Sequence, residues 1–505
     1  MATHPAFPNF PAMPNHLKAL LVILPLAALV FAYAQRSCLG LMAREDFVRR
    51  RNIWFGLTLL AFLAHSFWLY AAIAALILIH ASARESNRVA LFFLVLMLIP
   101  PTEALLPGLG LINYFFSLTH VRLLALVILL PAYLGLRQRS DTPAFGRFAT
   151  DKILAAYLLL SLALLLRETT VTDILRNAFY LFTDIFLPYY VISRSLRHLS
   201  QFREAMMSFV LAAMILAVVC AFEAARHWHL YRALADALGV PMDSLSMIER
   251  SGVLRAMGTS GHPIAAGYIM TVAMAFFLYL KDFMPLPASR RMGFAVLAAG
   301  LVAPLSRGPW VGTSAMFAVF LGAGPQALRR VFVAIIVGIM AISLLAVIPG
   351  GQRVLDLLPF IGSVERGSID YRQQMLEATY AVMLRNPLFG SVNFAAAPEL
   401  QAMIQGQGMI DIVNTYLLIG LRSGVVGLGL FIGFFVFLVW GLFSALRRLP
   451  PEAEENRLLG RALMAALIGI LVTIFTVSSV GLIPVIYWSV AGLGVAYTRM
   501  IREEY

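Results

Sequence analysis

Two arginines in short polar motifs are the residues of this chain best suited to chemistry. Arg255 stands in Arg-Ala-Met-Gly, which Gly261-His262-Pro263 follows, and Arg307 stands in Ser-Arg-Gly-Pro-Trp. A guanidinium stays charged at any relevant pH and binds phosphate through two parallel hydrogen bonds. Because a cation at the mouth of a hydrophobic segment is costly, such arginines usually serve a negatively charged substrate. The motifs favour a pyrophosphate whose lipid tail stays in the bilayer, with ordinary snorkelling of each arginine as the alternative.

Several other polar residues fall on the same side of the predicted membrane and are candidates for substrate binding. Arg122 begins a hydrophobic segment and Arg372 belongs to the largest polar loop. Both are suited to a second phosphate or to a glycan. Tyr371, Asn414 and Tyr416 are suited to sugars through hydrogen bonding and stacking, although helix packing is an equal alternative for Tyr416.

The composition fixes the class of protein. Of the 505 residues, 60% are apolar and 13% are charged. The runs 331–349 and 461–479 approach the ~20 apolar residues that cross a bilayer. No soluble core is this apolar at such a length, so we expect an all-α, polytopic transmembrane helical bundle of about 13 to 15 spans. The net charge of +13 reflects arginines in short loops rather than nucleic acid binding.

Loop charges orient the spans through the positive-inside rule. The basic loops, predicted to be cytoplasmic, are 36–52, 137–152, 194–203, 281–291, 329–330 and 444–461. The segments that then face the opposite side are 104–117, 229–262, 350–412 and the turn at 306–309. All the polar motifs therefore fall on one side of the membrane.

The same reading divides the chain into three parts. We expect transmembrane helices with short loops over 1–349, a large periplasmic loop over 350–412 and C-terminal transmembrane helices over 413–505. Within the first part, the stretch 53–80 is too long for one simple span and predicts two short ones around His65-Ser66.

The loop 350–412 is the one sizeable polar piece of the chain. It predicts a helix from about Tyr371 to Leu384, stopped by Asn386-Pro387. It is too small for an independent catalytic domain. We therefore expect a lid or wall over a site that the membrane helices form.

Several familiar chemistries lack their motifs. The chain has no P-loop for ATP and no Gly-x-Ser-x-Gly elbow of a hydrolase. It has no His-Glu-x-x-His, cysteine cluster or paired-histidine spacing for a metal. We expect no metal and no cofactor, so activity should survive EDTA.

The order, side and spacing of the motifs resemble the O-antigen ligase and O-antigen polymerase superfamily. Besides the two arginine motifs, the resemblance rests on Asn386-Pro-Leu-Phe-Gly390 and on Asn414-Thr-Tyr416-Leu followed by Gly424-Val-Val-Gly427-Leu, and it covers roughly residues 110–445. It implies a glycosyltransferase of the bacterial inner membrane that takes a glycan from an undecaprenyl-pyrophosphate donor on the periplasmic side. The glycan passes to an acceptor sugar hydroxyl without metal or nucleotide sugar. Arg255 and Arg307 match the family's two pyrophosphate-neutralising arginines.

One departure from the family's pattern concerns the catalytic base. The usual motif is His-Asn-x-Tyr-Leu, in which the histidine activates the acceptor, whereas this chain has Val413 there. Asp411 is the nearest ionisable group and our candidate base, with loop capping as the alternative. A helix would turn Asp411 away from the Val413 position, and an extended stretch would place both on one face. His262 is the second candidate, although a structural or positioning role is favoured for it.

The expected reaction is direct displacement with inversion, in which the acceptor hydroxyl expels lipid pyrophosphate. The missing histidine favours a polymerase of exopolysaccharide or O-antigen repeat units, with a chain-length regulator and export proteins as partners. The alternative is a ligase that joins the glycan to lipid A-core. A transporter or flippase of a lipid-linked sugar is the rival from another class. Asp184, inside a predicted span, favours that rival, but the sequence shows no internal repeat.

Overall fold

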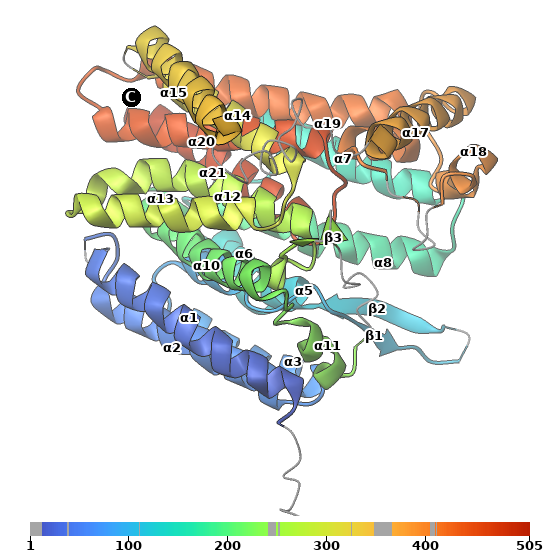
Figure 1. The fold of residues 1–505 in the computed structure, drawn as a ribbon. Coiled ribbons are helices and arrows are strands. Elements are labelled where there is room, and N and C mark those ends of the chain that lie inside the picture. The colour runs from blue at the N-terminus through green and yellow to red at the C-terminus, as the bar shows by residue number, and fades with distance from the viewer. Residues whose placement is uncertain are drawn as a thin grey trace, which may run out of the picture.

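The computed structural model describes residues 13–37, 40–110, 112–240, 249–250, 253–324, 326–347, 366–404, 410 and 412–505. In these residues the chain is a bundle of helices that lie side by side along one direction (Figure 1). Six described helices are long and apolar enough to cross a membrane: Asn15–Ser37, His120–Gln138, Leu199–Arg226, Pro263–Phe283, Thr415–Arg448 and Glu454–Phe475. The predicted all-α, polytopic fold is confirmed. The total of about 13 to 15 spans stays a prediction.

The first half of the chain contains α1 (Asn15–Ser37), α2 (Arg44–Leu63), α3 (Phe67–Ala83), α4 (Arg88–Val95), α5 (His120–Leu124), α6 (Leu130–Gln138), α7 (Ala149–Leu165), α8 (Val171–Leu181), α9 (Leu187–Ser195) and α10 (Leu199–Arg226). The second half contains α11 (Arg232–Leu238), α12 (Pro263–Leu280), α13 (Pro287–Val302), α14 (Arg307–Gly322), α15 (Ala327–Val347), α17 (Arg366–Arg385), α18 (Pro398–Gln401), α19 (Thr415–Arg448), α20 (Glu454–Phe475) and α21 (Ile483–Glu504). The π-helical turns η1 (Ala125–Leu129) and η2 (Phe182–Phe186) join α5 to α6 and α8 to α9. α12 lies at the centre of the bundle, because 94% of the residues in its most apolar stretch are buried.

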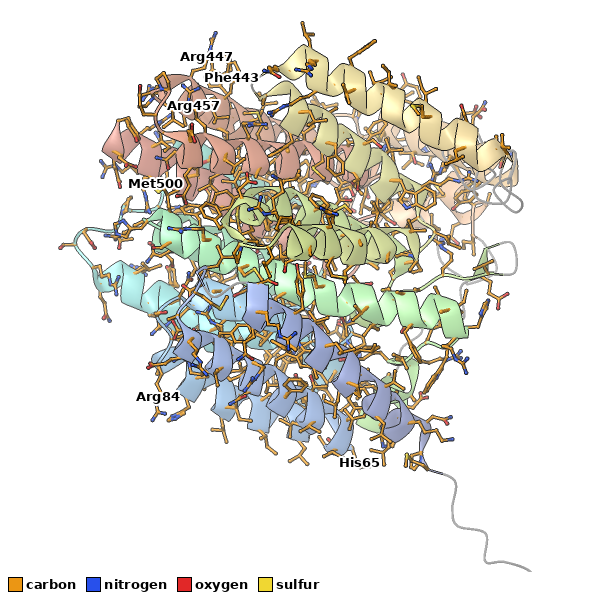
Figure 2. All side chains as sticks on the ribbon, turned by 60° about the vertical axis from the view of Figure 1, so that its left-hand side comes forward. His65, Arg84, Phe443, Arg447, Arg457 and Met500 are labelled. Atoms are coloured by element: carbon orange, nitrogen blue, oxygen red, sulfur yellow. The ribbon has the colours of Figure 1, made fainter. Side chains whose placement is uncertain are left out.

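The two ends of the bundle differ in character. The C-terminus lies at one end, and α17, α18 and the strands β1 and β2 lie at the other (Figure 1). Figure 2 shows Arg84, Arg447, Arg457 and Met500 at one end, and His65 away from them. We call the end that holds Arg84, Arg447, Arg457 and the C-terminus the basic end. The opposite end, which holds α17, α18, β1 and β2, is the motif end.

The stretch 53–80 forms two helices, as predicted. α2 ends at Leu63 and α3 begins at Phe67. Between them, His65 has a φ of 51°, a left-handed conformation that cannot continue a right-handed helix.

Two short β-hairpins at the motif end were not predicted. β1 (Glu103–Pro107) pairs antiparallel with β2 (Tyr114–Thr119), and β3 (Glu249–Arg250) pairs with β4 (Val253–Leu254). Short apolar runs such as Ala104-Leu-Leu do not distinguish a strand from the end of a helix by periodicity. The first hairpin leads directly into α5, where Thr119 Oγ1 accepts the N–H of Arg122 (3.3 Å).

The Asn386-Pro-Leu-Phe-Gly390 motif inserts into a break in α19. α17 ends at Arg385, directly before Asn386 as predicted, although it begins earlier, at Arg366. Beyond it, the Val425 N–H donates to the Pro387 carbonyl oxygen (2.8 Å) and Ser391 N–H to Leu421 O (2.9 Å). α19 is broken at Gly424, which has φ 59° and ψ −165°. The two glycine-containing motifs therefore form one backbone joint.

Gly424→Ala is expected to destabilise this joint. The conformation of Gly424 is essentially restricted to glycine and costs another residue about 1–3 kcal/mol. A Cβ there would also lie 2.3 Å from the Leu388 carbonyl carbon, which is backbone and cannot rotate away. Thermal unfolding of the purified protein in detergent measures the effect. Gly429→Ala on the same helix is the matched control, because a Cβ there meets nothing within 4 Å. Equal melting temperatures for the two variants would contradict the role of this joint.

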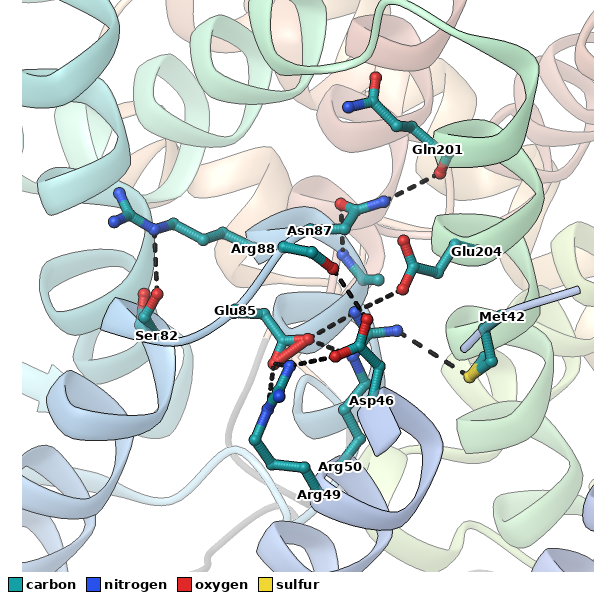
Figure 3. A network of polar contacts seen from close by, with 12 residues as sticks. Met42, Asp46, Arg49, Arg50, Ser82, Glu85, Asn87, Arg88, Gln201 and Glu204 are labelled. Atoms are coloured by element: carbon teal, nitrogen blue, oxygen red, sulfur yellow. Dashed lines mark hydrogen bonds and ion pairs between the residues drawn. The ribbon is translucent and has the colours of Figure 1, made fainter. Parts of the chain in front are cut away.

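A buried ionic network ties α2 to α10, away from the motifs (Figure 3). Arg50 is only 1% exposed, and its Nε donates to Glu85 Oε1 (2.7 Å) while Nη2 lies 2.8 Å from Glu204 Oε1. Asn87 caps α4 and donates to the Gln201 carbonyl oxygen (3.0 Å). Since a buried charge without its partner is strongly destabilising, the network fixes how these helices pack.

Candidate active site

Arg255 and the turn that carries Arg307 are joined directly. The Arg255 guanidinium donates from Nε to the Pro304 carbonyl oxygen (3.1 Å) and from Nη2 to Ser306 Oγ (2.8 Å). α13 ends at Val302 and α14 begins at Arg307, so the break between the two helices exists but lies at 303–306, earlier than the predicted 306–309. Both arginine residues are half-buried. The two predicted pyrophosphate residues therefore belong to one cluster.

The turn before α14 holds Arg307 in a fixed place. Leu305 has a φ of 48°, a left-handed conformation that costs a leucine about 1–3 kcal/mol and persists only where the surroundings enforce it. Gly308 has no room for a side chain, because a Cβ would lie 2.5 Å from Thr476 Oγ1. Arg307 is thus the first residue of a helix that starts from a tightly packed turn.

Three helices begin around this cluster. α12 begins at Pro263, α14 at Arg307 and α19 at Thr415. The first turns of α12 and α14 pack closely, since a Cβ on Gly267 would lie 2.9 Å from Pro309 Cβ. The first N–H groups of a helix carry partial positive charge and attract anions. These helix starts add to the charge of the two arginines, and the cluster suits an anionic group.

The segment that follows α20, residues 476–481, connects α19 to the arginine turn and was not identified from the sequence. Thr415 donates its N–H to the Val477 carbonyl oxygen (3.1 Å), and its Oγ1 lies 2.9 Å from Ser479 Oγ. The neighbouring Thr476 is the residue that packs against Gly308. Serines and a glycine after an apolar run indicate a loop, but they do not say which elements the loop contacts.

Asn414 and Tyr416 have structural contacts of their own. Asn414 caps α19, because its Oδ1 accepts the N–H groups of Tyr416 (2.8 Å) and Leu417 (3.3 Å). The Tyr416 hydroxyl donates to the Leu471 carbonyl oxygen (3.1 Å), and its ring lies 6.1 Å from that of Phe475. Tyr416 therefore packs against α20, as its alternative interpretation requires. Contact of either residue with a sugar stays a prediction.

Asp411 lies outside the residues that the structure describes, so its role as base stays a prediction. Residues 412–414 are not helical, and Asn414 is extended, with φ −151° and ψ 117°. Val413 therefore precedes α19 and is not part of a helix.

His262 caps α12 through one ring nitrogen, Nδ1. Its other ring nitrogen, Nε2, is left as a hydrogen-bond donor and not as a base. Its Nδ1 accepts the N–H of Ile264 (3.2 Å). Burial and the nearby charge of Arg255 lower the pKa of His262 to about 4, so the ring is neutral at pH 7. With Nδ1 occupied as an acceptor, the proton of the neutral ring is on Nε2. His262 can therefore donate to a substrate oxygen, in keeping with the favoured positioning role.

Lowering the pH should destabilise the protein through His262. An unfolded histidine binds a proton below about pH 6.5, whereas the folded ring stays neutral down to about pH 4. The unfolded state binds more protons in this window, so stability decreases as the pH falls through it. His262→Asn keeps an oxygen that can cap Ile264 but does not titrate. Melting temperatures from pH 7.5 to 5 should decline less steeply for this variant than for the wild type, and parallel curves would contradict the prediction.

Arg122 is paired with Asp184. Its Nε and Nη2 donate to Asp184 Oδ2 (3.2 and 3.0 Å), and its Nη1 donates to the Ser117 carbonyl oxygen (3.0 Å). The guanidinium also lies 3.7 Å from the centre of the Tyr180 ring. Asp184 thus has a structural partner within the bundle, and its presence in a span does not require a transported substrate. A phosphate at Arg122 would compete with this carboxylate, and that role stays a prediction.

Tyr371 and Arg372 lie on α17, above the start of α19. Tyr371 packs against a small apolar cluster separate from the main core: Met375, Val382, Phe394, Leu400, Ile412 and Leu421. Because Ile412 and Leu421 flank the first turn of α19, this cluster fixes α17 beside it. Arg372 is exposed. The arrangement agrees with a wall at the motif end, and contact of either residue with substrate stays a prediction.

Glu223, at the end of α10, positions the Arg255 segment and was missed by the sequence analysis. Its side chain is 1% exposed. Oε2 accepts the N–H groups of Met257 (3.0 Å) and Gly258 (2.9 Å), and Oε1 accepts that of Leu230 (2.9 Å). One carboxylate thereby satisfies three backbone donors, two of them directly after Arg255 and one in the turn that follows α10. A single glutamate at the end of an apolar helix gives no signal of such distant partners.

An apolar groove of about 420 Å³ runs between α19 and α20. Its lining residues are Tyr416, Ile432, Phe435, Val436, Val439, Trp440, Phe443, Met464, Ile468 and Leu471. Tyr416 is two residues from the cap of α19, so the groove starts next to the motif end. Such a surface can accommodate a hydrocarbon chain.

The fold and the site define a polytopic helical membrane protein with a cluster of two arginines at one end. Residues 292–432 match the model of a family described as O-antigen ligase. No curated protein matches the chain. The match supports the predicted resemblance to the O-antigen ligase and O-antigen polymerase superfamily over this segment of the chain. The matched segment contains Arg307, Asp411 and Asn414, and Arg255 precedes it.

Proposed function

We propose that the protein polymerises undecaprenyl-pyrophosphate-linked repeat units into exopolysaccharide or O-antigen. The motif end faces the periplasm of a bacterial inner membrane, because the basic loops at the other end are retained in the cytoplasm. The observation that carries the proposal is the hydrogen-bonded pair of Arg255 and the Ser306 turn, with Arg307 as the next residue. Two arginines and several helix starts suit the two phosphates of a lipid carrier better than a neutral substrate.

The donor is divided between this cluster and the bilayer. The pyrophosphate binds at Arg255 and Arg307, and the isoprenoid chain follows the apolar groove that starts at Tyr416. The first sugar of the donor then lies beside the 412–414 stretch, where α17 provides a wall. His262 Nε2 donates a hydrogen bond to a phosphate or sugar oxygen.

Transfer is a single displacement with inversion and needs no metal. The acceptor hydroxyl oxygen attacks the anomeric carbon of the donor sugar, and the bond from that carbon to the pyrophosphate oxygen breaks. Asp411 takes the hydroxyl proton. The bonding pair leaves with undecaprenyl pyrophosphate, whose developing charge Arg255 and Arg307 stabilise, which is where fixed cations lower a barrier most.

The main alternative is ligation of the finished glycan to lipid A-core. The name of the matched family favours it, whereas Val413 in place of the family's usual histidine favours an acceptor positioned differently. Ligase and polymerase share the donor site and differ only in the acceptor.

The glycan phenotype of a deletion strain tests the function. A polymerase mutant accumulates single repeat units on the lipid carrier, which is the expected result. Free lipid-linked polymer would instead identify a ligase, and accumulation on the cytoplasmic face would identify a flippase. Electrophoresis of extracted lipid-linked glycans separates these outcomes.

A further inference from the structure

A polar pocket lies at the basic end, away from the candidate active site. It has a volume of about 430 Å³ and lies between the start of α7, α19 and the last turns of α21. Its lining residues are Pro143, Arg147, Phe148, Ala149, Thr150, Phe437, Leu438, Trp440, Gly441, Val495, Thr498, Arg499, Arg502 and Glu503. Figure 2 labels Met500, the neighbour of Arg499, at this end.

The pocket carries uncompensated positive charge. Three arginines, Arg147, Arg499 and Arg502, face one carboxylate, Glu503. Arg499 is only 5% exposed. Its Nη2 donates to the Leu196 carbonyl oxygen (2.6 Å), but in the described part of the chain its Nε has no hydrogen-bond acceptor. The nearest carboxylate oxygen, on Glu503, is 3.9 Å away and belongs to a side chain that is 64% exposed.

The neighbouring acid cannot supply the missing charge. Asp151 Oδ2 lies 2.5 Å from Arg194 Nη2, and both side chains are fully buried. The same carboxylate oxygen accepts the N–H groups of Gly146 and Phe148 and so caps α7. Arg499 also donates from Nη1 to the Arg194 carbonyl oxygen (3.4 Å), so its partners are two neutral carbonyl groups and one distant, exposed carboxylate. Since burying a guanidinium without a close counter-charge is costly, the geometry favours an anion from outside the chain.

The remaining walls of the pocket suit a phosphate on a lipid. Ala149 and Thr150 belong to the first turn of α7, whose N–H groups attract anions. On the other side, Phe437 and Trp440 are 52% and 67% exposed, as aromatic residues often are at a membrane interface. A soluble anion would use the arginines alone, whereas a phospholipid would also cover these rings.

We propose that this pocket binds the phosphate headgroup of an anionic phospholipid of the cytoplasmic leaflet. Arg147, Arg499 and Arg502 contact the phosphate, and the acyl chains lie against Phe437 and Trp440, the latter at the border with the apolar groove of the donor. The choice of the cytoplasmic leaflet rests on the proposed orientation of the protein, in which the basic end is cytoplasmic. Binding of the lipid does not depend on glycan transfer. The lipid anchors the ends of α7, α19 and α21 to one another.

Thermal unfolding of the purified full chain in detergent, with added lipid, tests the proposal. Phosphatidylglycerol should raise the melting temperature of the wild type, and phosphatidylcholine should not. The variant Arg147→Gln/Arg502→Gln alters only exposed arginines and should weaken the phosphatidylglycerol response at least about tenfold in concentration. Arg447→Gln/Arg448→Gln, at the exposed end of α19, is the control and should respond like the wild type.

Each contrary outcome overturns the proposal. If phosphatidylglycerol raised the melting temperature of the pocket variant as much as that of the wild type, the lipid would bind elsewhere. The same conclusion would follow if the pocket variant and the control variant lost the response equally. An equal response to phosphatidylcholine would remove the role of charge. If inorganic phosphate alone produced the same rise, the pocket would bind a soluble anion rather than a lipid. None of these readouts requires transferase activity, so failure of the proposed function would leave the test intact.

Discussion

Arg307→Ala and Arg255→Ala are each expected to abolish glycan transfer while the protein is still made and inserted at near wild-type levels. Removal of one group that stabilises charge in a transition state typically slows a reaction about 10²–10³-fold. Lysine should restore little activity, because it keeps the charge but loses the bidentate geometry of the guanidinium. At position 255, lysine also lacks the two nitrogen donors, Nε and Nη2, that bind the Pro304 carbonyl oxygen and Ser306 Oγ at the same time. Polymer on gels and protein in membranes are measured together.

Arg226→Ala is the matched control for the arginine variants. Arg226 is the last residue of α10, on the same side of the bundle, and it is exposed. The control should make polymer normally, which separates a general loss of positive charge from loss of the cluster. Wild-type polymer in the Arg307→Ala strain would eliminate the pyrophosphate assignment.

Asp411→Asn is expected to be almost as defective as Asp411→Ala. Amide and carboxylate have similar shapes, but only the carboxylate takes a proton, and loss of a general base typically slows a reaction ~10²–10⁴-fold. If Asp411 only capped the loop before Asn414, asparagine would replace it well, because both accept the same backbone hydrogen bonds. Polymer length and yield in the two strains distinguish these roles, and a near-normal Asp411→Asn strain would rule out the base.

Val413→His in the Asp411→Asn background is the companion experiment. It restores the histidine that the family usually has at this position. A gain of polymer would indicate that the site keeps the geometry of its histidine-containing relatives. His262 is a weaker candidate base, since its Nδ1 already accepts the N–H of Ile264.

The sequence predicted the features that depend on local rules. The break at His65 followed from the length of the stretch 53–80, and the end of α17 followed from Asn386-Pro387, which stop a helix; both are confirmed. The break before α14 was also predicted, but at 306–309 instead of 303–306. The class of fold followed from composition alone. These signals can be read from the sequence without knowing which helices pack against each other.

The sequence could not predict the contacts that assemble the site. Glu223 accepts N–H groups 34 and 35 residues away, and Thr415 binds a carbonyl 62 residues away. The residues around a single glutamate or threonine do not indicate which distant backbone groups it will bind. Arg122 illustrates the same limit, because its pairing with Asp184 turned two separate candidate residues into one ion pair.

The most direct test of the account is transfer by the purified protein in liposomes that contain a lipid-pyrophosphate-linked repeat unit. We expect a ladder of longer lipid-linked glycans and release of one undecaprenyl pyrophosphate for each glycosidic bond formed, with both products lost in Arg307→Ala. Movement of the donor across the bilayer without bond formation, or an undiminished ladder from Arg307→Ala, would contradict the account.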